Sequence, residues 1–214
     1  MQARQLLTLS GLAFVILIVI AYAGLSGSTP EAEASGAEVK AFYTDHSSRQ
    51  QAAAYIVVLA VPLLIFFAAA VRTALIESSE RRSELWANIF LGGALVAGTG
   101  FLGAAIFHLA LTAAPEEHGA STMQGLNALE SVSWVGFTGG LGIMLLGAAG
   151  AMLPAASGVR WLGWIALVLG VVIFTPAGFF AFLGSGLWIA LASVAMTMRL
   201  RARPASLRES AVAG

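Results

Sequence analysis

The chain has 214 residues, of which 58% are hydrophobic and only 10% are charged, and its formal net charge is zero. Soluble domains carry about 25% charged residues, so this composition excludes a water-soluble globular protein, and the zero net charge gives no basic field for nucleic acid. The chain has no cysteine, which excludes disulfides, thiolate metal sites, iron–sulfur clusters and a cysteine nucleophile.

The first predicted element lies within residues 1–25 and is an apolar run preceded by Arg4. We interpret it as a transmembrane anchor, because it is long for the apolar part of a signal peptide; Ala21-Tyr22-Ala23 nevertheless fits a cleavage site. Residues 26–51 predict an acidic segment outside the membrane. Its second half has apolar residues at helical spacing, which predicts a short interfacial helix.

Residues 52–198 predict a transmembrane bundle, because their apolar runs approach the roughly 20 residues that cross a hydrocarbon core. Pro62 is expected to kink the first of these helices. Residues 160–198 are too many for one crossing, and Thr175-Pro176-Ala177-Gly178 offers a break. The spans of the bundle are therefore expected near residues 52–71, 86–113, 131–153, 161–174 and 179–198.

Lys and Arg predict the orientation of the chain in the membrane. With six spans and the N-terminus inside, all but Lys40 and Arg49 of the eleven basic residues lie on the cytoplasmic side. The tail, residues 199–214, is basic at its start. The predicted fold class is thus an all-α polytopic bundle of about six spans with both termini cytoplasmic, in a cell membrane.

Gly98, Gly100 and Gly103 have the G-x-G-x-x-G spacing of a dinucleotide-binding turn. That turn needs a strand before the glycines and a helix opening at them, whereas apolar helical sequence flanks these on both sides. Small residues on one helix face instead allow two backbones to approach closely in lipid. We expect the third and fourth spans to pack through Gly93, Gly100, Ala104, Gly136 and Gly140. The alternative is that both helices are simply rich in glycine and have other partners.

His108 is the only histidine within a predicted span, about 33 Å along the helix from Trp86 and therefore near the outer interface. Glu130 begins the next span at a similar depth. The structural interpretation is that His108 hydrogen-bonds a neighbouring helix and that Glu130 is favoured by the helix dipole. A site for a small ligand or a partner, facing the outside, is the second interpretation, with the residues His108, Glu130, Asn127, Asp45 and Trp134.

Two further interpretations of these polar residues stay open, a proton relay and a metal site that adds His46 and His118. The sequence has no compact ligand motif such as H-E-x-x-H, so no metal is predicted. A b-type haem between helices would need two histidines within the membrane, and only His108 qualifies. No cofactor is predicted either.

Three stretches resemble segments of small uncharacterised integral membrane proteins of actinobacteria. They contain Phe42-Tyr43, Asn127-Ala128-Leu129 and Arg160-Trp161-Leu162-Gly163-Trp164. The resemblance covers most of the chain after residue 36. It implies a multi-pass protein of a bacterial plasma membrane and implies no catalytic residue. His46 stands where the resemblance implies a polar residue other than histidine, which argues against a metal there.

These observations predict a non-enzymatic membrane protein: an accessory, structural or partner-binding subunit. Its expected partners are the lipid bilayer and either another membrane protein or further copies of itself, and not nucleic acid. The alternative function is a small-solute transporter or sensor that uses the polar residues near the outer face. An enzyme acting on a lipid or periplasmic substrate is a third hypothesis, for which the sequence offers no nucleophile or metal-ligand set.

Overall fold

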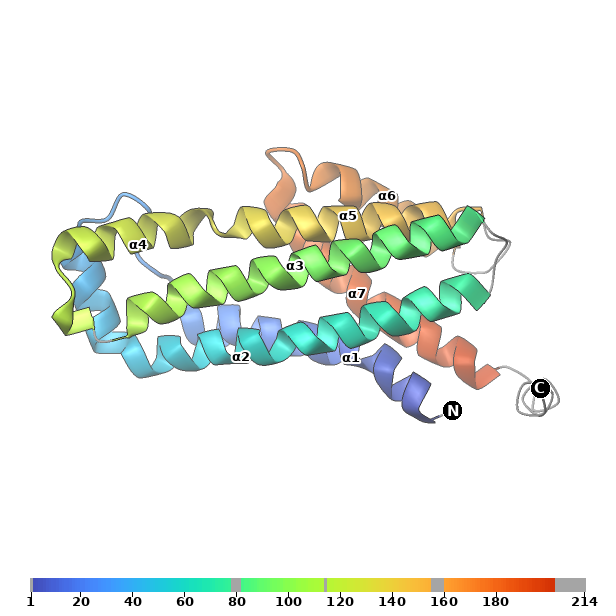
Figure 1. The fold of residues 1–214 in the computed structure, drawn as a ribbon, viewed down its shortest axis with the longest axis horizontal. Coiled ribbons are helices and arrows are strands. Elements are labelled where there is room, and N and C mark those ends of the chain that lie inside the picture. The colour runs from blue at the N-terminus through green and yellow to red at the C-terminus, as the bar shows by residue number, and fades with distance from the viewer. Residues whose placement is uncertain (1, 78–81, 114, 155–159, 203–214) are drawn as a thin grey trace.

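The computed structural model describes residues 2–77, 82–113, 115–154 and 160–202, and these are helical apart from short connections (Figure 1). The all-α fold class is confirmed. The elements are α1 Gln2–Val19, the π-helix η1 Ile20–Ser26, α2 Gly36–Glu77, α3 Arg82–Thr112, the 3-10 helix η2 Pro115–Glu117, α4 Ala120–Val132, α5 Trp134–Met152, α6 Arg160–Val172 and α7 Gly178–Ala202.

Five helical segments in the described residues are long and apolar enough to cross a membrane. They are Arg4–Ser26, Gly36–Glu77, Glu84–Thr112, Ala120–Met152 and Gly178–Arg199. The helix α6 has 13 residues, about 20 Å, whereas a hydrocarbon core is about 30 Å thick. The break predicted at Thr175–Gly178 is present, but the span expected over residues 161–174 is too short to cross.

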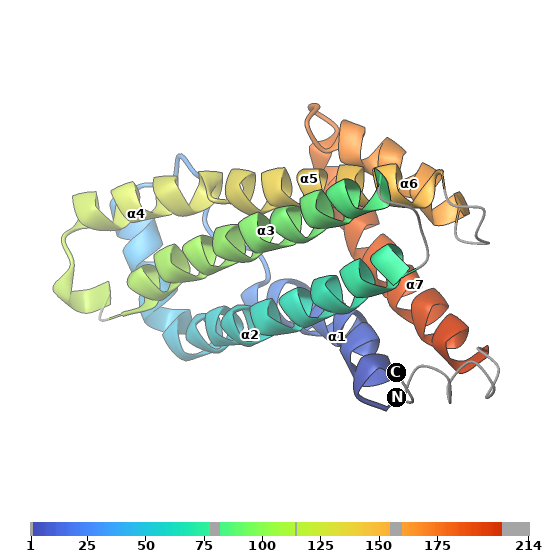
Figure 2. The ribbon, with the colours of Figure 1, turned by 45° about the vertical axis from the view of Figure 1, so that its right-hand side comes forward.

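The helices α2, α3 and α4–α5 lie side by side along the long axis of the molecule, with α1 behind α2 (Figure 1). The helix α6 begins at the end of the molecule that contains Trp86 and turns back partway along α5, where Phe174 lies against Gly142. The helix α7 then returns toward that end. Residue 2 and the end of α7 consequently lie at the same end, as Figure 2 also shows.

We name the two ends of the bundle by residues that lie there. The Arg72 end contains Arg72 and Asn88, whose side chains are joined by a 2.7 Å hydrogen bond. The Glu130 end contains Glu130 and His108. The predicted tail, residues 199–214, lies mostly outside the described residues.

The helix α2 is longer than predicted, because the expected interfacial helix in residues 26–51 is its first part. The backbone N–H and the hydroxyl of Ser35 both donate to the Glu38 carboxylate at 2.8 Å, a capping box that starts the helix at Gly36. The helix also continues through Pro62. Its buried side recurs every seven residues across the expected boundary, at Tyr43, Gln50, Val57, Leu64 and Val71.

The helices α3 and α5 touch through their backbones. A Cβ added to Gly140 would overlap the backbone of Ala97, and one added to Gly93 would overlap the backbone of Met144. Gly100 faces Gly136 and Phe137 in the same way. Close approach of this kind supplies dispersion contacts that replace the missing hydrophobic drive between helices in lipid.

Aromatic rings extend this contact toward the other helices. Phe101 and Phe137 stack with ring centroids 4.4 Å apart, and Phe182 of α7 lies 5.3 Å from Phe137. Ala104, one turn after Phe101, is buried. The α3–α5 pair thus packs against α2 through α3 and against α6 through α5, while α1 packs mainly on α2 and α7.

Candidate functional site

His108 anchors a buried polar cluster at the Glu130 end. It projects from α3 and is 7% exposed, and its Nε2 lies 2.9 Å from Oε1 of Gln50 on α2, which is 1% exposed. The Gln50 amide nitrogen donates to the carbonyl of Ser26, at the end of η1, over 2.8 Å. The cluster thus joins α2, α3 and the chain segment that follows α1.

The hydrogen bond to Ser26 determines the proton on His108. A backbone carbonyl only accepts, so the Gln50 amide nitrogen must face Ser26 and its Oε1 must face His108. The Nε2 of His108 is then the donor in the 2.9 Å bond. This assignment follows from the bonding network, as tautomers usually must.

Glu130 of α4 lies on the other side of the His108 ring, with its Oε1 3.4 Å from Nδ1. Because Nε2 already carries a proton, Nδ1 can donate to Glu130 only when the ring is doubly protonated. The Glu130 side chain is 21% exposed, so this carboxylate lies at the edge of the cluster. A second proton on the His108 ring would therefore add a hydrogen bond between α3 and α4.

A small apolar core supports the cluster. Tyr43, Val39, Leu111 and Met123 are all fully buried and pack together, apart from the main core of the bundle. The edge of the Tyr43 ring faces His108 at 5.8 Å. The Tyr43 hydroxyl is buried without a hydrogen-bond partner in the described residues. Such an orphan is costly unless water reaches it.

Asn127 holds the linker before α2 and does not join His108. Its amide nitrogen donates to the carbonyl of Glu31 over 2.8 Å, and the side chain is 1% exposed. Its Oδ1 has no partner within the described parts of the chain. Asn127 therefore connects α4 to the linker through a hydrogen bond.

The other residues expected at this site lie apart from it. Asp45 is exposed on α2, and Trp134, the first residue of α5, is 49% exposed. His46 stacks on Phe42 with ring centroids 4.6 Å apart. Over the described ranges, no three His, Asp or Glu side chains gather where they could hold a metal ion.

Gln50 is the member of the cluster that the sequence analysis missed. It lies seven residues after Tyr43 and seven before Val57, so it continues the buried side of α2. A polar residue in line with a buried apolar row was the available signal. The change from polar to apolar sequence predicts a boundary at residue 51, and that boundary separates Gln50 from the apolar row that follows it.

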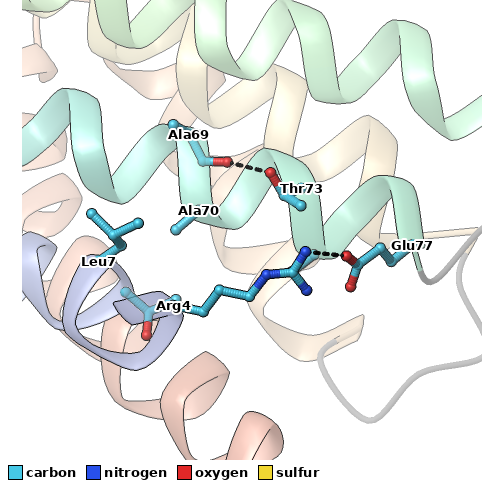
Figure 3. Close-up of a pocket in the computed structure, with 8 residues that line it drawn as sticks. Arg4, Leu7, Ala69, Ala70, Thr73 and Glu77 are labelled. Atoms are coloured by element: carbon cyan, nitrogen blue, oxygen red, sulfur yellow. Dashed lines mark hydrogen bonds and ion pairs between the residues drawn. The ribbon is translucent and has the colours of Figure 1, made fainter. Parts of the chain in front are cut away.

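A recess lies at the Arg72 end, between α1 and α2. It encloses about 210 Å³ and is lined by Leu7, Ala70 and Thr73, among others. Figure 3 shows Arg4 reaching across it from α1 to Glu77, which it meets at 2.7 Å. An exposed ion pair of this kind contributes about 0–1 kcal/mol, so it positions α1 more than it stabilises the fold.

Comparisons of the chain with family models, curated proteins and solved structures find no match. The resemblance to small actinobacterial membrane proteins accordingly stays a prediction.

Proposed function

We propose that this protein is a non-enzymatic membrane subunit that binds a partner and holds a rigid helical scaffold for it. The observation that carries the proposal is the hydrogen bonding of the buried polar side chains. Gln50, His108 and Asn127 bond one another or the backbone, across α2, α3 and α4. Side chains used in this way tie helices together and leave few groups free to bind a solute.

The orientation supports a place in a bacterial plasma membrane. In the described parts of the chain, the Arg72 end carries Arg4, Arg72, Arg82, Arg160 and Arg199. It therefore faces the cytoplasm under the positive-inside rule. The Glu130 end then faces outward with the exposed carboxylates of Glu33, Asp45 and Glu117. An accessory subunit would present this acidic helical end to a partner outside the membrane.

The second candidate is a sensor or transporter whose polar site is the His108 cluster. The specific observation in its favour is the His108–Glu130 pair at 3.4 Å, beside the unpartnered hydroxyl of Tyr43. Protonation of His108 would add a charged contact between α3 and α4. A sensor could use that change, and a transporter could pass a proton through it.

Reconstitution separates the two functions. The full chain is purified in mild detergent by an affinity tag and, in parallel, placed alone in liposomes for proton-flux measurement. We expect a membrane protein to copurify with the chain in fixed stoichiometry. The same protein should copurify equally well with a folded His108→Gln variant. The liposomes that contain the chain alone should show no proton flux. Proton flux by the chain alone that His108→Gln abolishes would support the second candidate and contradict the first.

A further inference from the structure

An apolar groove of about 370 Å³ opens between the second half of α1 and the first half of α7. Three buried side chains are among those that line it, Phe14 of α1, Phe101 of α3 and Leu141 of α5. Ile18 lines it on the α1 side and Gly186 on the α7 side. Almost every side chain that faces it is a hydrocarbon.

The groove follows from the short α6–α7 hairpin. The two helices α1 and α7 run antiparallel and touch near the Arg72 end, where the hydroxyls of Thr8 and Thr197 share a 2.7 Å hydrogen bond. The helix α7 begins only at Gly178, next to the turn against Gly142 of α5. Beyond that turn α1 still packs on α2 but has no α7 beside it, and the groove lies where α1 and α7 part.

The size of the groove fits a single hydrocarbon chain. Ligand sites in proteins enclose about 300–1,000 Å³, and this volume lies within that range. A helix is about 10–12 Å across with its side chains, so 370 Å³ would hold only about one helical turn. A second copy or a partner helix could cover the groove but could not fill it.

The side chain of Arg49 lies at the end of the groove that is nearer the Glu130 end of the bundle. Tyr22 and Ala23 line its end, and the Arg49 guanidinium donates to the carbonyl of the next residue, Gly24, over 3.3 Å. Arg49 is exposed, and in the described ranges no carboxylate forms an ion pair with it. Arg49 can therefore still receive an anion.

The other basic residue at the Glu130 end is engaged in the fold. The Lys40 ammonium donates to the carbonyls of Glu116 and His118 at 2.7 and 3.0 Å. Arg49 is thus the cation of this end that is both exposed and next to an apolar groove. A ligand with one anionic head and one hydrocarbon chain matches both features.

We propose that the groove binds one acyl chain of an anionic phospholipid, with the lipid phosphate at Arg49. This inference goes beyond the partner-binding function and does not depend on it. Each basic residue near a membrane surface contributes about 1 kcal/mol of attraction to anionic lipid, which is about fivefold in affinity. Arg49 therefore determines the preference for an anionic head group, and the groove binds the acyl chain.

Lipid adducts of the delipidated full chain, measured by native mass spectrometry, test the proposal. The probes are phosphatidylglycerol and phosphatidylcholine with the same acyl chains. Both lipids carry a phosphate, but only phosphatidylglycerol has a net negative charge, so we expect it to bind about fivefold more tightly. Arg49→Gln should remove that preference, Arg49→Lys should retain most of it, and neither should abolish chain binding.

Filling the groove tests the chain site separately. Gly186 has no atom closer than 4.0 Å to the place of an added Cβ, so Gly186→Leu projects into the groove without a backbone clash. We expect it to remove the tight adduct of both lipids. Gly103→Leu is the matched control, because its added Cβ also meets open space and it lies outside the groove.

Two results would overturn the proposal. One is a folded Gly186→Leu protein that binds both lipids like the native chain. The other is a purified dimer whose copies cross-link through Leu187→Cys in the groove wall and carry no lipid, a clean experiment because the chain has no cysteine of its own. The second result would assign the groove to a second copy.

Discussion

Gln50 and His108 are 58 residues apart in the sequence, yet their side chains meet at 2.9 Å in the interior of the bundle. Each is at most 7% exposed, so neither can exchange this bond for one with bulk water. The bond also fixes which ring nitrogen of His108 carries a proton, through the further bond from Gln50 to Ser26. One glutamine thereby orients the cluster.

Gln50→Leu should destabilise the protein by about 1–3 kcal/mol, because it leaves the Nε2–H of His108 buried without an acceptor. Thermal unfolding in detergent measures the change. Gln51→Leu is the matched control, since Gln51 is exposed and its replacement should change stability by less than about 0.5 kcal/mol. Equal losses in the two variants would contradict the role assigned to Gln50.

Gly140→Ala should destabilise the α3–α5 pair, because the added methyl would overlap the backbone of Ala97 and force the helices apart. Overpacking of this kind costs about 1–3 kcal/mol. The neighbouring Gly139 faces open space, so Gly139→Ala should be neutral or stabilise the helix by up to about 1 kcal/mol. The unfolding midpoint of Gly140→Ala should therefore fall below that of the native chain, while the midpoint of Gly139→Ala should stay the same or rise.

Sequence reasoning reached furthest where one helix face carried the information. The small residues predicted a close α3–α5 contact, and Gly100 does face Gly136 and Phe137 across it. Counting residues along the third span placed His108 near the depth of Glu130, and the two side chains lie 3.4 Å apart. Both inferences need only helical geometry and a neighbouring antiparallel helix.

Other features depended on contacts that no single segment reveals. The break at Thr175–Gly178 was predicted, but the hydropathy of α6 does not show that it ends against Gly142 instead of crossing. The unbroken α2 was missed because polarity changes near residue 51 while the buried row continues. Asp45 was grouped with His108 by composition, yet its helix face is exposed.

Lys40→Met should loosen the connection between α3 and α4. The Lys40 ammonium donates to the carbonyls of Glu116 and His118 and so holds η2 and the turn after it against α2. Without these bonds the connection should open more often, and local opening controls proteolysis. We expect a glutamate-specific protease to cut the exposed Glu116 and Glu117 several-fold faster.

The native chain under the same protease is the reference for this experiment. The variant Lys40→Arg retains a cation that can reach carbonyl oxygens and should stay close to the native cleavage rate. An unchanged rate in Lys40→Met would show that other contacts hold the connection closed. The unfolding midpoint should change little, since the loss is local.

Thr175→Cys should be hidden from water on both sides of a membrane. The helix α6 is about 20 Å long, so a turn that follows it lies within the hydrocarbon if α6 begins at the interface. Trp161 and Trp164 near its start are about half exposed, as interfacial tryptophans often are. A membrane-impermeant maleimide needs a hydrated thiolate, so it should not label this position from either side.

Two exposed positions calibrate the labelling. Asp45→Cys should react only from outside the cell and Glu84→Cys only in inside-out vesicles, because they lie at opposite ends of the bundle. Thr175→Cys should react once detergent removes the bilayer, since Thr175 is exposed. Labelling of Thr175→Cys from the same side as Asp45→Cys would mean that α6 completes a crossing, and the six-span topology would then hold.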